Sequence, residues 1–127
     1  KGTIGYAEES QTKGMTVANL GENGNYAAPS AEAAAKIVGA APVESGREAN
    51  DLALKLNRKA DGYPAVLVSY SIVCSQYADA KTGAAIKAFI GYITSDAGQK
   101  AAVATAGNAP LAGDLATKVK SAVDSIK

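Results

Sequence analysis

Residues 65–74 read Ala-Val-Leu-Val-Ser-Tyr-Ser-Ile-Val-Cys, the most strand-like run in the chain. β-Branched and aromatic residues of this kind suit a pleated surface. Val66, Val68, Tyr70 and Ile72 fall on one face because strand side chains alternate. The first half of the run is apolar on both faces, which is typical of a strand covered on both sides in an α/β sheet. We therefore expect an α/β fold whose mixed sheet is flanked by helices.

Helical patterns surround this predicted strand. Ile86, Phe89, Ile90 and Ile93 follow the i, i+3, i+4, i+7 spacing of one apolar helix face. Ser30 and Ser95 are good N-caps, and Asp114 is expected to cap the last helix. Gly107 is expected to end a helix in the left-handed conformation. The sequence predicts four helices, over residues 31–38, 81–94, 96–106 and 115–126.

Shorter patterns predict the remaining strands. Residues 3–7, 15–20 and 52–56 are each expected to be a short strand, and Asn23-Gly24 within residues 21–25 predicts a tight turn. A strand over 3–7 has no preceding partner, and its two edges need pairing. We take this as an indication that further sequence precedes the chain, and the start at Lys1 suggests a processed chain, an expressed piece or a proteolytic fragment.

The composition excludes several classes of site. The chain has 127 residues, with 13 Lys and Arg, 12 Asp and Glu, one Cys and no His, which suits one ordinary domain. Without His there is no Ser-His-Asp triad and no imidazole metal ligand. A net charge of +1 without a dense basic run argues against a nucleic-acid surface. No apolar run approaches the ~20 residues of a membrane helix. We expect no enzyme activity, no metal and no cofactor.

Three groups of residues could still carry chemistry. Glu8-Glu9 is an adjacent acid pair, but neighbouring strand residues point to opposite faces. Ser69 and Ser71 have no nearby base to activate them. Cys74 has three alternatives: a small buried hydrophobe, a disulfide to a cysteine outside this chain, or a reactive thiol. The residues alone reveal no active site.

Four stretches, in order and in register, resemble the phosphate-specific substrate-binding proteins of ABC importers, in their C-terminal part. Gly2-Thr3-Ile4-Gly5-Tyr6 resembles a family strand, and Asp61-Gly62-Tyr63-Pro64 resembles the start of a long strand. Ala88-Phe89-Ile90 with Thr94 to Lys100 resembles a helix pair, and Ala109-Pro110-Leu111 resembles the turn before the last helix. The match covers essentially the whole chain.

The resemblance implies the C-terminal portion of a two-lobed, periplasmic-binding-protein-like fold of type II. Residues 1–62 would hold a crossover strand and a partly irregular region, and residues 63–127 a strand and three helices of one lobe. Ile4, Gly5, Tyr6, Tyr63 and Pro64 would lie near the hinge between the lobes. The family's Arg and Ser-Gly-Thr anion loop is absent from this chain, so no phosphate-binding residue is assigned and the ligands are expected upstream.

The function that the resemblance implies is phosphate binding and delivery to an ABC transporter permease. Such a protein would be secreted, as an extracellular cell-surface lipoprotein or in the periplasm, and its partners would be inorganic phosphate and the permease. Two alternatives stay open: a binding lobe for another small anion on the same fold, and a secreted interaction module without a ligand. Unpaired strand edges would also allow self-association of the chain.

Overall fold

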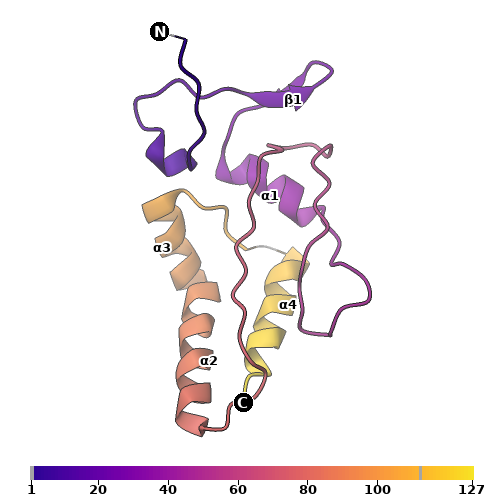
Figure 1. Cartoon of the computed structure of the whole chain (residues 1–127), viewed down its shortest axis with the longest axis vertical. Helices are drawn as coiled ribbons and strands as arrows, with labels where there is room; N and C mark the ends of the chain where they lie inside the picture. The colour runs from indigo at the N-terminus through magenta and orange to yellow at the C-terminus, as the bar shows by residue number, and fades with distance from the viewer. Residues whose placement is uncertain (1, 112) are drawn as a thin grey trace.

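The computed structural model describes residues 2–111 and 113–127. These residues form four α-helices, one short 3-10 helix and one two-stranded sheet, joined by long extended segments (Figure 1). The mixture of helix and strand agrees with the expected α/β class, but the described sheet is a small antiparallel hairpin rather than a mixed sheet. The elements are η1 (Glu9–Gln11), β1 (Leu20–Glu22), β2 (Asn25–Ala27), α1 (Ala31–Gly39), α2 (Ala80–Thr94), α3 (Asp96–Ala106) and α4 (Gly113–Asp124).

The hairpin turns at Asn23-Gly24, as the sequence predicts. Both residues have positive φ, 53° and 88°, which is the backbone that a two-residue hairpin turn requires. Leu20 pairs with Ala27 and Glu22 with Asn25. The strand expected over 15–20 was placed too early, because only its last residue joins the ladder.

The predicted caps of α1 and α3 are confirmed. The Ser30 hydroxyl accepts a hydrogen bond from the Ala33 N–H at 3.1 Å, and the Ser95 hydroxyl accepts one from the Gly98 N–H at 3.2 Å. Gly107 ends α3 in the left-handed conformation, with φ 67°. The cap expected at Asp114 is wrong, because α4 begins at Gly113 and places Asp114 inside the first turn. A carboxylate there is still favoured by the helix dipole.

Asp79 caps α2 with both of its carboxylate oxygens. Oδ1 accepts from the Lys81 N–H, and Oδ2 accepts from the Thr82 N–H and, at 2.7 Å, from the Thr82 hydroxyl. The hydrogen bond from the Thr82 side chain, with those from the two N–H groups, lowers the pKa of Asp79 below its ordinary value.

This cap predicts a pH dependence at the start of α2. A carboxyl whose pKa is lower in the folded than in the unfolded chain stabilises the fold above its unfolded pKa, and that contribution is lost as the pH falls through the folded pKa. We expect urea unfolding at about pH 7 and about pH 3, on either side of the ordinary Asp pKa, to show a larger acid destabilisation for the native chain than for Asp79→Asn. Equal losses in the two proteins would contradict the assignment.

The main core lies where α2 packs against α4 and α3. Ile90 of α2 is buried there, as are Val123 in the last turn of α4 and Ile126 just after it. The Lys87 ammonium donates hydrogen bonds to the carbonyls of Asp124, at 2.5 Å, and Ile126, at 3.3 Å. A cation at the C-terminal end of α4 is favoured by the helix dipole and by its unpaired carbonyls. This bond therefore ties the middle of α2 to the last turn of α4.

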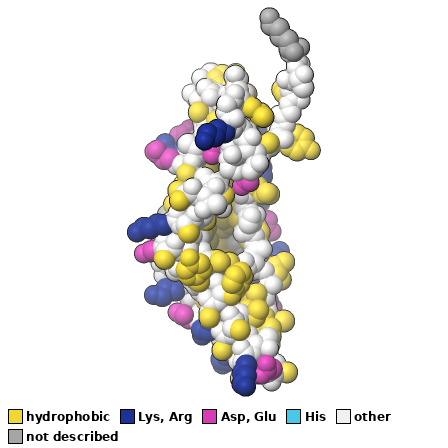
Figure 2. Space-filling model, turned by 90° about the vertical axis from the view of Figure 1, so that its left-hand side faces the viewer, with side chains coloured by type: hydrophobic (Ala, Val, Ile, Leu, Met, Phe, Trp, Pro, Cys, Tyr) yellow, Lys and Arg dark blue, Asp and Glu magenta, His cyan; other side chains and the backbone are white. Residues whose placement is uncertain are grey.

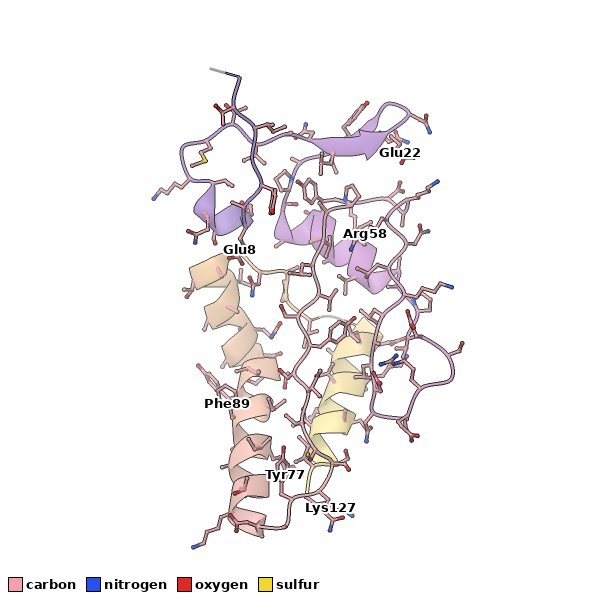
Figure 3. All side chains as sticks on the ribbon, in the orientation of Figure 1. Glu8, Glu22, Arg58, Tyr77, Phe89 and Lys127 are labelled. Carbon is pink, nitrogen blue, oxygen red and sulfur yellow. The ribbon has the colours of Figure 1, made fainter. Side chains whose placement is uncertain are left out.

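The sequence prediction for Phe89 is wrong. Phe89 and Tyr92 are exposed, although Phe89 shares the expected apolar face with Ile90. The Phe89 side chain projects from the side of α2 that faces away from α4 (Figure 3). Hydrophobic side chains gather about midway along the face on which α2 and α3 lie (Figure 2). Described residues therefore cover only the Ile90 side of α2.

Three of the predicted strands do not form as expected. Residues 3–7 and 65–74 are extended without belonging to any ladder, and residues 52–56 contribute one isolated bridge, between Val43 and Leu54. A strand needs a neighbour for its backbone groups, and the described residues place none beside 65–74. That segment runs alongside α2 and α4 as a single extended chain (Figure 1). Among the described residues, no helix is long and apolar enough to cross a membrane.

Candidate functional site

The predicted hinge residues Tyr63 and Pro64 lie where the chain docks against α1. The Tyr63 N–H donates to the Ala33 carbonyl at 3.1 Å, beside Ile37, which is fully buried. Gly62, with φ 138°, brings the backbone close enough that a β-carbon would meet the Ala33 carbonyl and the Ile37 side chain. We call residues 58–66 with this face of α1 the Gly62 junction.

The Arg58 side chain holds the backbone of the Gly62 junction by hydrogen bonds. Its Nη1 donates to the carbonyl of Pro64 at 2.6 Å and to the carbonyl of Val66 at 3.0 Å (Figure 3). One guanidinium therefore fixes the path of the chain as it leaves Pro64 for the extended segment. Charge-assisted bonds of this kind are stronger than neutral ones. Nothing in the local sequence around Arg58 indicates which carbonyls its guanidinium reaches.

The other predicted hinge stretch lies apart from any packing. Ile4 and Tyr6 are almost wholly exposed, and Gly5 has open space around its α-carbon. The structure thus joins Tyr63 to α1 and leaves Ile4, Gly5 and Tyr6 without such a contact. The assignment of all five residues to a hinge stays a prediction.

Cys74 is a free and exposed thiol, so the interpretation of it as a small buried hydrophobe is wrong. Its N–H donates to the Tyr77 hydroxyl at 3.1 Å, which holds the backbone rather than the sulfur. The thiol is therefore accessible to reagents and to a cysteine outside this chain. The disulfide stays a prediction.

Exposure predicts fast labelling of Cys74. We expect a maleimide to modify the reduced, native chain at nearly the rate it shows in urea, because no packing shields the sulfur. Mass spectrometry over time checks this. Protection in the native chain, released by urea, would place the thiol in a buried setting and contradict the structure.

Two open hollows lie side by side near the end of α4, and both include Asn50. One of about 270 Å³ is lined by Val43, Ala49, Asn50, Leu52, Lys118 and Ser121. The other, of about 290 Å³, is lined by Asn50, Ser75, Gln76, Ser125 and Lys127. The Asn50 amide donates to the Ser125 hydroxyl at 3.0 Å between them. Anion sites that bind tightly use hydrogen-bond donors that are withdrawn from water. The described residues include no buried polar side chain, so neither hollow offers side-chain donors of that kind.

Among the described residues, one charged side chain lines each hollow, Lys118 the first and Lys127 the second. The ion pair that the described residues form joins Arg47 to Asp51 at 2.7 Å on the surface. The hydrogen bond between them raises the pKa of Arg47 and lowers the pKa of Asp51. An exposed pair of this kind adds little to stability. Within residues 2–111 and 113–127, no group of three His, Cys, Asp or Glu side chains could hold a metal ion.

Comparison with known proteins shows that the chain is similar to phosphate-binding proteins. The chain is 31% identical, over 134 aligned residues, to phosphate-binding protein PstS 3 of Mycobacterium tuberculosis (strain H37Rv) and to phosphate-binding protein PstS3 of Mycobacterium bovis (strain BCG). The alignment covers 98% of this chain but 35% of each relative, so the chain spans about a third of their length. No protein-family model and no solved structure matches the chain.

Proposed function

We propose that this chain is the C-terminal part of a phosphate-binding protein that delivers inorganic phosphate to the permease of an ABC importer. The observation that carries the proposal is the 31% identity to phosphate-binding proteins, which extends over 98% of the chain. The relatives are named as phosphate-binding proteins. The present sequence lacks His and the usual pairs of a nucleophilic side chain and a base. Such a protein would act outside the cytoplasm, as a cell-surface lipoprotein or in the periplasm.

Within that protein the chain would serve as scaffold. The phosphate ligands would belong to the preceding two-thirds, and residues 63–127 would form the strand and helices of one of the two lobes. The buried Ile90 side of α2, packed on α4, supplies a rigid body for such a lobe. Lobes that close on a ligand move as rigid bodies while a few residues change their backbone angles. The Gly62 junction would be one such pivot.

A chimera tests the proposed function. The matching third of the M. tuberculosis relative is replaced by this chain, and phosphate binding is measured by titration calorimetry. We expect one-to-one binding within about tenfold of the relative, about 1.4 kcal/mol, because the ligands stay in place and only the scaffold changes. The control is the relative with the same third deleted, which should not bind. A folded chimera that fails to bind phosphate would contradict the proposal.

A substitution in the chimera tests the hinge separately. Tyr63→Ala removes the ring next to the Ala33 bond and should change phosphate affinity or the compaction that phosphate induces in solution scattering. Tyr26→Ala, in the exposed hairpin, is the matched control and should change neither. Unaltered affinity and unaltered scattering in Tyr63→Ala would remove Tyr63 from the hinge without affecting the assignment of phosphate binding.

A further inference from the structure

We propose that residues 66–75 act as a taut tether, which transmits movement of the Gly62 junction to the body formed by α2 and α4. The start of the tether is held at the junction. Arg58 donates hydrogen bonds to the carbonyls of Pro64 and Val66, and the Val66 side chain is buried. The junction itself is hydrogen-bonded to α1. The first end of the tether is therefore fixed to the junction.

The second end of the tether is held by Lys127. The Lys127 N–H donates to the Ser75 carbonyl at 3.0 Å, and the Tyr77 N–H donates to the Lys127 carbonyl at 2.9 Å. Gly83 of α2 allows this approach, because a β-carbon there would lie 2.8 Å from the Lys127 carbonyl carbon. Lys87 of α2 also donates to carbonyls in the turn that precedes Lys127. The second end is therefore fixed to α2 and to the end of α4.

The chain between these two anchors has no slack. Residues 65–74 contain no turn, bend or helix, and they run as a single extended chain beside α2 and α4 (Figure 1). The anchors lie far apart, with Arg58 beside α1 and Lys127 beyond the end of α4 (Figure 3). An extended chain already spans close to its greatest length, about 3.3–3.6 Å per residue. A movement of one end must therefore pull the other end or break an anchor.

Little along the sides of the tether resists such a pull. Every residue from Ser69 to Gln76 is exposed. Within the described part of the chain, no backbone N–H of residues 66–73 donates a hydrogen bond. The middle of the tether is bonded to another segment at Tyr70, whose hydroxyl accepts from the Leu54 N–H at 3.0 Å. A pull therefore reaches the far end, and it also strains the bond to Leu54.

Two glycines of α2 test the tether by amide hydrogen exchange, measured by NMR on this chain, and the test does not depend on phosphate binding. Gly83→Ala pushes Lys127 away and breaks the second anchor, whereas a β-carbon at Gly91 would make an ordinary contact at 3.8 Å. We expect Gly83→Ala to raise the exchange rates of the Leu54 and Tyr63 N–H groups at least about threefold, because both depend on the tension of the tether. Gly91→Ala is the matched control and should leave both rates unchanged.

The reverse experiment breaks the first anchor. Arg58→Gln removes the charge-assisted bonds to the start of the tether. It should raise the exchange rate of the Tyr77 N–H, which is bonded to Lys127, by a similar factor. Coupling between two ends acts in both directions. Arg47→Gln, which removes an exposed guanidinium paired with Asp51, is the matched control and should leave that rate unchanged.

Two checks keep the outcome clear. Circular dichroism confirms that each variant keeps its helices, and Lys87→Met, which loosens the turn before Lys127, decides if Gly83→Ala does not fold. The Gly98 N–H of α3 lies off the tether and should keep its exchange rate. An effect of Gly83→Ala confined to the Tyr77 N–H would show that the two ends are independent, and it would overturn the proposal. So would an equal rise at Gly98, which would mean that the whole fold had loosened.

Discussion

Ile37→Ala lowers the free energy of unfolding by about 2–5 kcal/mol, the cost of emptying a buried aliphatic site. Ile37 has no exposed surface, and in the described residues it is the one large side chain buried to that degree. It lies on α1 next to Gly62, so its loss removes the packing that holds the Gly62 junction. Because the other buried side chains are few, the surroundings offer little to refill the space.

Urea unfolding followed by circular dichroism measures the effect of Ile37→Ala. Ile72→Ala is the matched control, since the same atoms are removed from a side chain that is 96% exposed. We expect the control to change stability by no more than about 0.5 kcal/mol. Similar losses in the two variants would mean that α1 is not packed as described.

Gly62→Ala is the second large effect, with an expected loss of about 2–6 kcal/mol from two causes. The backbone of Gly62, at φ 138°, is one that L side chains rarely adopt, and such strain costs about 1–3 kcal/mol. A β-carbon would also lie 2.9 Å from Cγ1 of Ile37 and against the Ala33 carbonyl, and overpacking of that kind adds about 1–3 kcal/mol. The Tyr63–Ala33 hydrogen bond would be the first to break.

A second glycine separates the two causes. Gly46 also has positive φ, 77°, but a β-carbon there would meet open space. Gly46→Ala should therefore show backbone strain without a contact, and the difference between the two variants measures the contact with α1 together with the extra strain at φ 138°. If Gly62→Ala costs no more than Gly46→Ala, the close approach of residue 62 to α1 is refuted.

Features set by neighbouring residues could be predicted from the sequence. Ser30, Ser95 and Gly107 act within one helical turn of their own position, and Asn23-Gly24 needs only its own backbone angles. These local rules hold whatever surrounds them. The helix boundaries followed from the same signals to within a residue or two.

Features set by distant partners could not be predicted. The strand pattern of residues 65–74 reports what the segment would do beside another strand, and the described residues supply none. Phe89 was placed in the core by periodicity, but periodicity does not show which side of α2 has a neighbour. Arg58 and Gly62 gain their roles from the approach of the chain to α1, although Asp61-Gly62 is a turn signal that points to the right place.

We expect the groups that bind phosphate to lie outside this chain, and titration of phosphate into the isolated 127-residue chain tests this expectation. Circular dichroism first establishes that the helices are present, and the M. tuberculosis relative serves as the positive control. The isolated chain is expected to give heat of dilution alone under conditions in which the relative saturates. Saturable one-to-one binding by the chain itself would contradict the expectation.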